Sequence, residues 1–270
     1  MTMAHVEQAN PHESAPRVLA PVRGWRDVPY WLVAIALILA WMVQKILTDE
    51  EYRDAWDFIV PGLRLTIEVT AISFLIAMTL GLLAGLGRIA HNVVVRNVAL
   101  TYIEFIRGVP ILVLIYTVAF VAVPWAGESF GFQNNSVEFK WRAIIALALI
   151  YGAYLAEVFR AGIESVPTGQ SEAGRSLGMT HGQTMRRIVL PQAIRNMTPA
   201  IGNDLIAMLK DSSLVSVLAV REITQLGRLH ANSTFDFRET YLVLTICYLT
   251  LTIVLSLLLS WYRRWLGMDE

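Results

Sequence analysis

The chain has 270 residues, of which 55% are hydrophobic and 16% are charged, whereas ordinary soluble domains have about 45–50% apolar and about 25% charged residues. Lysine plus arginine and aspartate plus glutamate both number 22, so no net charge attracts nucleic acid. A single cysteine excludes a disulfide scaffold and a cysteine-based zinc site. Because the apolar residues come in long runs, the composition indicates an all-α integral membrane protein that lies in a lipid bilayer.

The predicted elements begin with a polar, proline-containing tail over residues 1–29, which is typical of disorder. The apolar run at 30–47 follows and is long enough to cross the hydrocarbon core of a bilayer. Five further runs of this kind come later in the chain: Leu65–Gly87, Val109–Gly127, Ala143–Ala156, Leu205–Val220 and Tyr241–Tyr262. The sequence therefore predicts about six transmembrane helices, of which Leu205–Val220 is the least apolar.

The orientation of these helices follows from the arginines and lysines of the short loops. The segments on the side of the N-terminus hold 13 of them, and those on the other side hold 8. Because positive loops stay inside, both termini are predicted to be cytoplasmic. We expect a multi-pass protein of the bacterial inner membrane.

Several kinds of chemistry have no residues to carry them. None of the three lysines follows a glycine, so the chain has no phosphate-binding P-loop. No His-x-x-x-His or Cys-x-x-Cys pair is present to hold a catalytic metal. We therefore expect that the chain is not an enzyme and that any ATP it uses is hydrolysed by another protein.

Two short polar motifs are interpreted as structural. Arg107-Gly108-Val109-Pro110 sets the direction of the backbone where the third span begins, because glycine and proline fix unusual turns. Glu157 and Arg160 are three residues apart, which favours an ion pair on one helix face.

The longest inside loop, 166–195, predicts two helices joined by a tight turn. Gly178 stands where a left-handed residue ends the first helix. Thr180 and Gln183 form a capping box that begins the second, and Pro191 ends or kinks it.

This loop resembles the EAA loop of ABC importer permeases. It reads Glu172-Ala173-Gly174, then Gly178, then nine residues, then Ile188-x-Leu190-Pro191. Gly174 stands where that family usually has alanine, which is a change between small residues. Segments elsewhere, among them Arg107–Val113 and Lys210–Val217, are similar to the polar amino-acid subfamily.

The resemblance implies a five-helix type I ABC importer permease core over residues 55–265, preceded by one extra helix at 30–47. In that family two permease subunits, identical or homologous, form the pathway, and each inserts its loop helix into an ABC ATPase subunit. An extracytoplasmic amino-acid-binding protein delivers the substrate. ATP and magnesium bind to the ATPase, and this chain is expected to bind neither a cofactor nor a metal.

By the same resemblance, the ATPase-coupling residues are Glu172, Ala173, Gly174, Gly178, Leu190 and Pro191. The alternative is that these residues only cap and space two helices. The function implied is that of a permease subunit of an ATP-driven amino-acid importer.

Adjacent charges in the fifth predicted span suggest a second site. Lys210 and Asp211 are costly inside a bilayer and need partners on another helix or in water. They form either an inter-helix ion pair or, with Ser212, Ser213 and Ser216, part of a substrate pathway. Two other functions stay open: a secondary transporter or channel that works alone, and a membrane assembly subunit that transports nothing.

Overall fold

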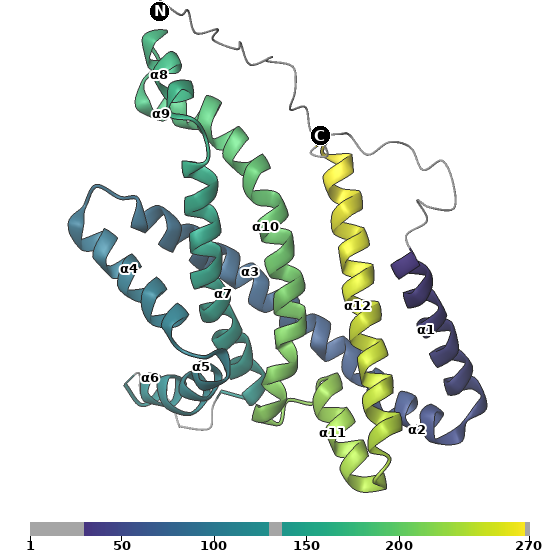
Figure 1. The fold of residues 1–270 in the computed structure, drawn as a ribbon. Helices are drawn as coiled ribbons and strands as arrows, with labels where there is room; N and C mark the ends of the chain where they lie inside the picture. The colour runs from purple at the N-terminus through teal and green to yellow at the C-terminus, as the bar shows by residue number, and fades with distance from the viewer. Residues whose placement is uncertain (1–29, 130–136, 268–270) are drawn as a thin grey trace, which may run out of the picture. The chain divides into compact units, whose positions relative to one another are not determined.

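The computed structural model describes residues 30–129 and 137–267, and all regular structure in these ranges is helical (Figure 1). The all-α prediction is confirmed. The tail predicted at 1–29 lies outside the described residues. The chain divides into two compact units, residues 1–43 and residues 44–270.

The first unit contains most of helix α1 (Tyr30–Thr48), which occupies the first predicted span. Leu37 and Ile38 on this helix are exposed, as expected of side chains that face acyl chains. The apolar stretch Leu32–Thr48 is shorter than the four membrane-crossing candidates of the second unit. That α1 crosses the membrane stays a prediction.

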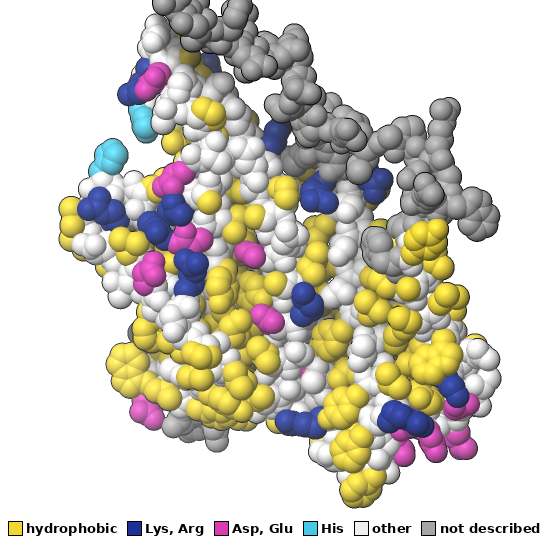
Figure 2. Space-filling model, viewed as in Figure 1, with side chains coloured by type: hydrophobic (Ala, Val, Ile, Leu, Met, Phe, Trp, Pro, Cys, Tyr) yellow, Lys and Arg dark blue, Asp and Glu magenta, His cyan; other side chains and the backbone are white. Residues whose placement is uncertain are grey.

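Four segments of the described chain are long and apolar enough to cross a membrane. The first joins α2 (Glu50–Ile59), the short 3₁₀ helix η2 (Val60–Gly62) and α3 (Leu63–Arg88). The others are α5 to α6 (Ile111–Ser129, with the π-helix η3 at Val118–Ala122), α7 (Phe139–Glu164) and α12 (Phe237–Trp265). They correspond to four of the predicted spans. Hydrophobic side chains also cover much of the face shown in Figure 2.

The predicted span Leu205–Val220 differs from the structure. Helix α10 (Leu190–Asp211) ends inside it, and the 3₁₀ helix η5 (Ser212–Leu218) follows, up to Ala219 with a left-handed φ of 58°. Serine hydroxyls compete for backbone hydrogen bonds, and Ser212 donates one to the Leu209 carbonyl at 2.7 Å. This segment therefore does not form one continuous apolar helix.

Helix α7 is the centre of the second unit and packs against α3, α4 (Val93–Gly108) and α10. In its most apolar window 72% of the residues are buried, against 22–33% in the other three segments. Gly81 and Gly85 of α3 let the two backbones approach, because a Cβ at Gly81 would lie 2.7 Å from the Cβ of Leu155. This close packing follows the small-residue pattern typical of membrane helices.

The predicted helix pair of the inside loop is present. It consists of α8 (Thr168–Ser176) and α9 (His181–Thr184), after which the chain runs through the π-helix η4 (Met185–Val189) into α10. Pro191 was predicted to end or kink the second helix. It does not end the helix, because the chain stays helical from His181 to Asp211. The wide π-turn before Pro191 accommodates the ring, which would otherwise clash with the preceding turn.

The last elements are α11 (Ile223–Thr234) and α12, which pack against each other and against α2. Glu222 caps α11 by accepting hydrogen bonds from the backbone N–H groups of Thr224 and Gln225, both at 2.8 Å. Its carboxyl group is fully buried, and this burial raises the pKa of Glu222 to about 6.

Candidate functional site

The corner between α8 and α9 is fixed by local hydrogen bonds. Gly178 has a φ of +81°, its N–H bonds to the Arg175 carbonyl at 2.9 Å, and the N–H of Met179 bonds to the Gly174 carbonyl at 3.1 Å. This pair of bonds is the Schellman motif, in which glycine carries the left-handed residue without strain. Thr180 and Gln183 then form the predicted capping box. The corner is a rigid unit.

Helix α8 packs against the following helix through one small residue. Gly174 is buried, and a Cβ there would lie 2.7 Å from the Cδ1 of Ile188 and 3.3 Å from the Oγ1 of Thr184. The structure therefore gives a reason for glycine where the resembling family usually has alanine: Ile188 would have to shift to admit a methyl group.

The opposite side of α8 is open. Glu172, Ala173 and Gly178 are exposed, and no other residue of the described chain lies within 4 Å of the position of a Cβ at Gly178. Leu177 directly follows the polar helix α8, and its apolar side chain is 83% exposed. Leu190 and Pro191 are exposed at the start of α10. Leu177 was not among the residues predicted from the sequence, although its position directly before the capping glycine could have marked it.

A network of ion pairs joins α7 to α3 and α4. The expected pair of Glu157 and Arg160 is present, with Nη2 3.0 Å from Oε2. The other carboxylate oxygen contacts Arg88 and lies 3.4 Å from Nη1 of Arg107. These partners were not predicted from the sequence because Arg88 and Arg107 lie on other helices. The network links α7 to the last turns of α3 and α4.

The motif around Arg107 makes the expected elbow. Helix α4 ends at Gly108, Val109 is extended with φ −114° and ψ 139°, and Pro110 directly precedes α5 (Ile111–Thr117). The role of these residues therefore agrees with a change of backbone direction.

Asp211 has a hydrogen-bond partner on another helix. The hydroxyl of Tyr151 on α7 donates to Oδ2 of Asp211 at 2.8 Å. Lys210 is exposed. Ser212 and Ser216 are buried, but they lie in a 3₁₀ helix, where residues three apart share a face. Ser213 therefore lies on the same face as Ser216, whereas Ser212 does not.

Asp204 is a further carboxylate near this cluster that was not predicted from the sequence. It lies on α10, two helical turns before Asp211 and hence on the same side. Oδ2 of Asp204 is buried without a hydrogen-bond partner among the described residues. The two-turn spacing of the aspartates was the signal that could have found it.

Comparison with known proteins identifies the family. The model of the binding-protein-dependent transport system inner membrane component matches residues 77–267. The chain belongs to this family. Among similar members, the probable amino-acid permease protein YxeN of Bacillus subtilis is 37% identical over 216 residues, which cover 77% of this chain and 94% of that relative. The glutamine transport system permease protein GlnP of Escherichia coli is 33% identical over 206 residues, which cover 76% of this chain and 91% of that relative.

A solved structure agrees with this membership in the inner membrane component family. The crystal structure of an amino acid ABC transporter with histidines contains a chain that is 36% identical to this one. The two superpose with a TM-score of 0.69 over 77% of this chain and 94% of the other. The membrane fold of the chain is therefore that of an ABC importer permease.

Proposed function

We propose that this chain is the permease subunit of an ATP-driven amino-acid importer and that a separate ABC ATPase hydrolyses the ATP. The observation that carries the proposal is the coupling corner, defined as residues 172–178. It is a helix end fixed by local hydrogen bonds, it has an open face, it includes the first part of the EAA pattern, and it lies in a chain of the right family. The ATPase would hold ATP and magnesium, and this chain would bind neither.

The structure supports a mechanical route from the coupling corner to the membrane. Helix α8 contacts the segment that begins at His181, and this segment stays helical as far as Asp211. A displacement of α8 by a closing ATPase dimer can thus be passed along one continuous rod to the Lys210–Asp211 pair. Switching of this kind needs a rigid element that two states share.

The polar cluster is the proposed substrate pathway. It contains Lys210, Asp211, Ser212, Ser213 and Ser216, together with Tyr151 and Asp204. An amino acid presents an ammonium and a carboxylate, and this segment offers charges of both signs where a membrane would otherwise exclude them. Relatives of similar identity are named for glutamine and for arginine, so the family alone does not select the side chain carried.

The remaining partners follow from the same proposal. A second permease subunit would complete the pathway, and an extracytoplasmic binding protein would deliver the amino acid. The family name supports a partner of this kind, and one solved relative is a bacterial alginate ABC transporter in complex with a periplasmic protein. Both termini would be cytoplasmic, which places α8 beside a cytoplasmic ATPase.

Co-purification tests the coupling role. The tagged chain should retain its ATPase in stoichiometric amount from detergent, and Leu177→Asp should release it because a charge replaces an exposed apolar contact. Gly182→Asp is the matched control, since it adds the same charge on α9 at another open position and should keep the ATPase. Retention by both variants, or an importer that works without any ATPase, would contradict the proposal.

A further inference from the structure

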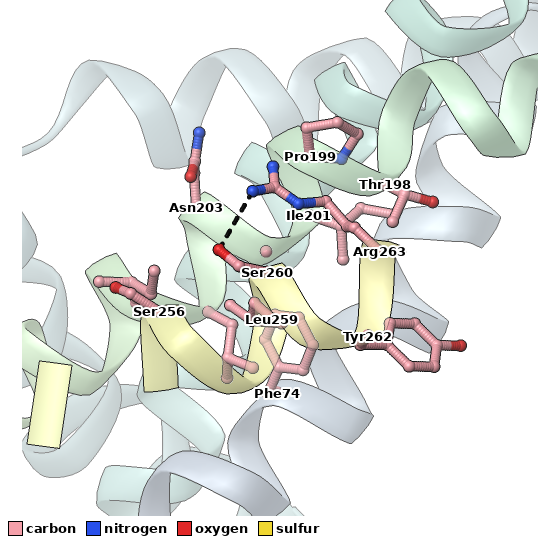
Figure 3. Close-up of a pocket in the computed structure, with 13 residues that line it drawn as sticks. Phe74, Thr198, Pro199, Ile201, Asn203, Ser256, Leu259, Ser260, Tyr262 and Arg263 are labelled. Carbon is pink, nitrogen blue, oxygen red and sulfur yellow. Dashed lines mark hydrogen bonds between the residues drawn. The ribbon is translucent and has the colours of Figure 1, made fainter. Parts of the chain in front are cut away.

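A cavity of about 220 Å³ lies between α3, α10 and α12 (Figure 3). Part of its lining is apolar, and includes Phe74, Ile201 and Leu259. The polar side chains in its lining are those of Thr198, Asn203, Ser256, Ser260, Tyr262 and Arg263. Among the described residues no carboxylate lines this cavity, so its one formal charge is positive.

The guanidinium of Arg263 is incompletely satisfied. Its Nη2 donates to Oγ of Ser260 at 3.4 Å, which is a long hydrogen bond. Its Nε is buried and has no partner among the described residues. Figure 3 shows the guanidinium turned toward the residues of α10. Because a buried charged donor without an acceptor is costly, the cavity is suited to an anion.

The cavity lies at the depth of lipid head groups. Trp261, Tyr262 and Trp265 next to Arg263 are all exposed, and aromatic residues of this kind mark the membrane–water interface. From Tyr241 to Arg263, α12 rises roughly 33 Å at 1.5 Å per residue, which is close to the thickness of about 30 Å of the hydrocarbon core. Arg263 therefore stands where α12 leaves the apolar layer.

A second cavity lies along the same three helices. It measures about 270 Å³, shares Leu205 with the first, and is almost entirely apolar, with Ala71, Leu251 and Leu255 in its lining. Leu251 lies roughly 18 Å along α12 from Arg263, which is about the depth of one leaflet, or half of the hydrocarbon core. A polar cavity and an apolar groove of acyl-chain length thus lie along the same three helices.

We propose that these two cavities form one binding site for an anionic phospholipid. The phosphate diester accepts hydrogen bonds from Arg263 and Ser260, and one acyl chain lies along the groove between α3, α10 and α12. The apolar groove selects a lipid over a free anion, because inorganic phosphate would use only the upper cavity. The bound lipid packs between α10 and α12 and holds their spacing.

Native mass spectrometry of the full chain, in the complex in which it purifies, tests the site. The probes are dioleoyl phosphatidylglycerol, dioleoyl phosphatidylcholine and inorganic phosphate, each added to delipidated protein. Arg263→Gln should weaken phosphatidylglycerol binding roughly tenfold, as expected for loss of a hydrogen bond to a charged group. Arg264→Gln is the matched control, because it removes the same charge next to the cavity and should leave binding unchanged.

Leu255→Trp separates the two sources of phosphate, because it fills the apolar groove without touching Arg263. It should abolish binding of phosphatidylglycerol. Equal binding by Arg263→Gln and by the unaltered chain would overturn the site. Tight binding of inorganic phosphate that Leu255→Trp leaves intact would also overturn the site. Lipid that binds only when a second copy of the chain is absent would overturn it as well. None of these outcomes depends on amino-acid transport or on the ATPase.

Discussion

Gly178 offers a way to separate backbone strain from contact with a partner. Its φ of +81° is disfavoured for any residue with a side chain, and we expect Gly178→Ala to cost roughly 1–2 kcal/mol at the α8–α9 corner. This strain shifts the local population of the native corner by a factor of about 5–30. Gly169→Ala is the control, because Gly169 also lies in open space but at an ordinary helical position of α8.

Gly178→Trp carries the same strain, and it adds a large side chain in space that the chain itself leaves empty. Any further loss relative to Gly178→Ala therefore reports on an external surface close to Gly178. We expect both variants to insert into the membrane, since the residue lies outside the spans.

The assay is ATP-driven uptake into liposomes that contain the permease, its ATPase and the binding protein. Gly169→Ala should transport normally, Gly178→Ala should transport a few-fold less, and Gly178→Trp should hydrolyse ATP without transport. Equal uptake by Gly178→Trp and Gly178→Ala would refute docking at this corner, and normal uptake by both would also refute the strain argument.

Three further predictions concern the rest of the chain. Asp211→Asn should impair uptake while assembly with the ATPase and basal ATP hydrolysis survive, and collapse of the complex would instead make Asp211 a structural residue. Because burial raises the pKa of Glu222 from its ordinary value of 4.5 to about 6, protonation favours the folded state. This contribution, about 2 kcal/mol, is present at pH below 4.5 and is lost as the pH rises through 6. We therefore expect the pH dependence of the thermal unfolding temperature in detergent, measured between pH 4 and pH 7, to be weaker in Glu222→Gln than in the unaltered chain. The same pH dependence in both proteins would contradict this role of Glu222. Single reactive cysteines should be labelled from outside an intact cell on the extracytoplasmic loops and protected on the cytoplasmic ones, and outside labelling at Ala9 would refute the six-span topology. The outside positions are 49–54, 128–132 and 230–234, and the inside positions are Ala9, Asn92, His181 and Asp269.

Local patterns were predictable from the sequence, whereas contacts between helices were not. Gly178 and the Thr180–Gln183 box act within one turn of the chain, so their residue types determine the α8–α9 corner. Glu157 shows the limit, because its partner Arg160 is on the same helix face and was found, but Arg88 arrives from α3 through packing that no local pattern encodes.

The fifth predicted span shows a second kind of limit. Hydropathy extended it to Val220, but the serines after Asp211 favour a tighter 3₁₀ helix, so the face that each serine occupies changed. Tyr151 was missed for the same reason as Arg88, because its contact with Asp211 depends on how α7 packs against α10. Asp204 lies on the same helix as Asp211, and its two-turn spacing was visible in the sequence.

Uptake of a radiolabelled amino acid by the reconstituted complex tests the central claim most directly. Liposomes that contain this chain, its ATPase and the binding protein should accumulate substrate against a gradient when ATP is supplied on the ATPase side. Uptake should stop when ATP is replaced by a non-hydrolysable analogue or when the ATPase is omitted. Accumulation that continues without the ATPase would contradict the account and identify a transporter that works alone.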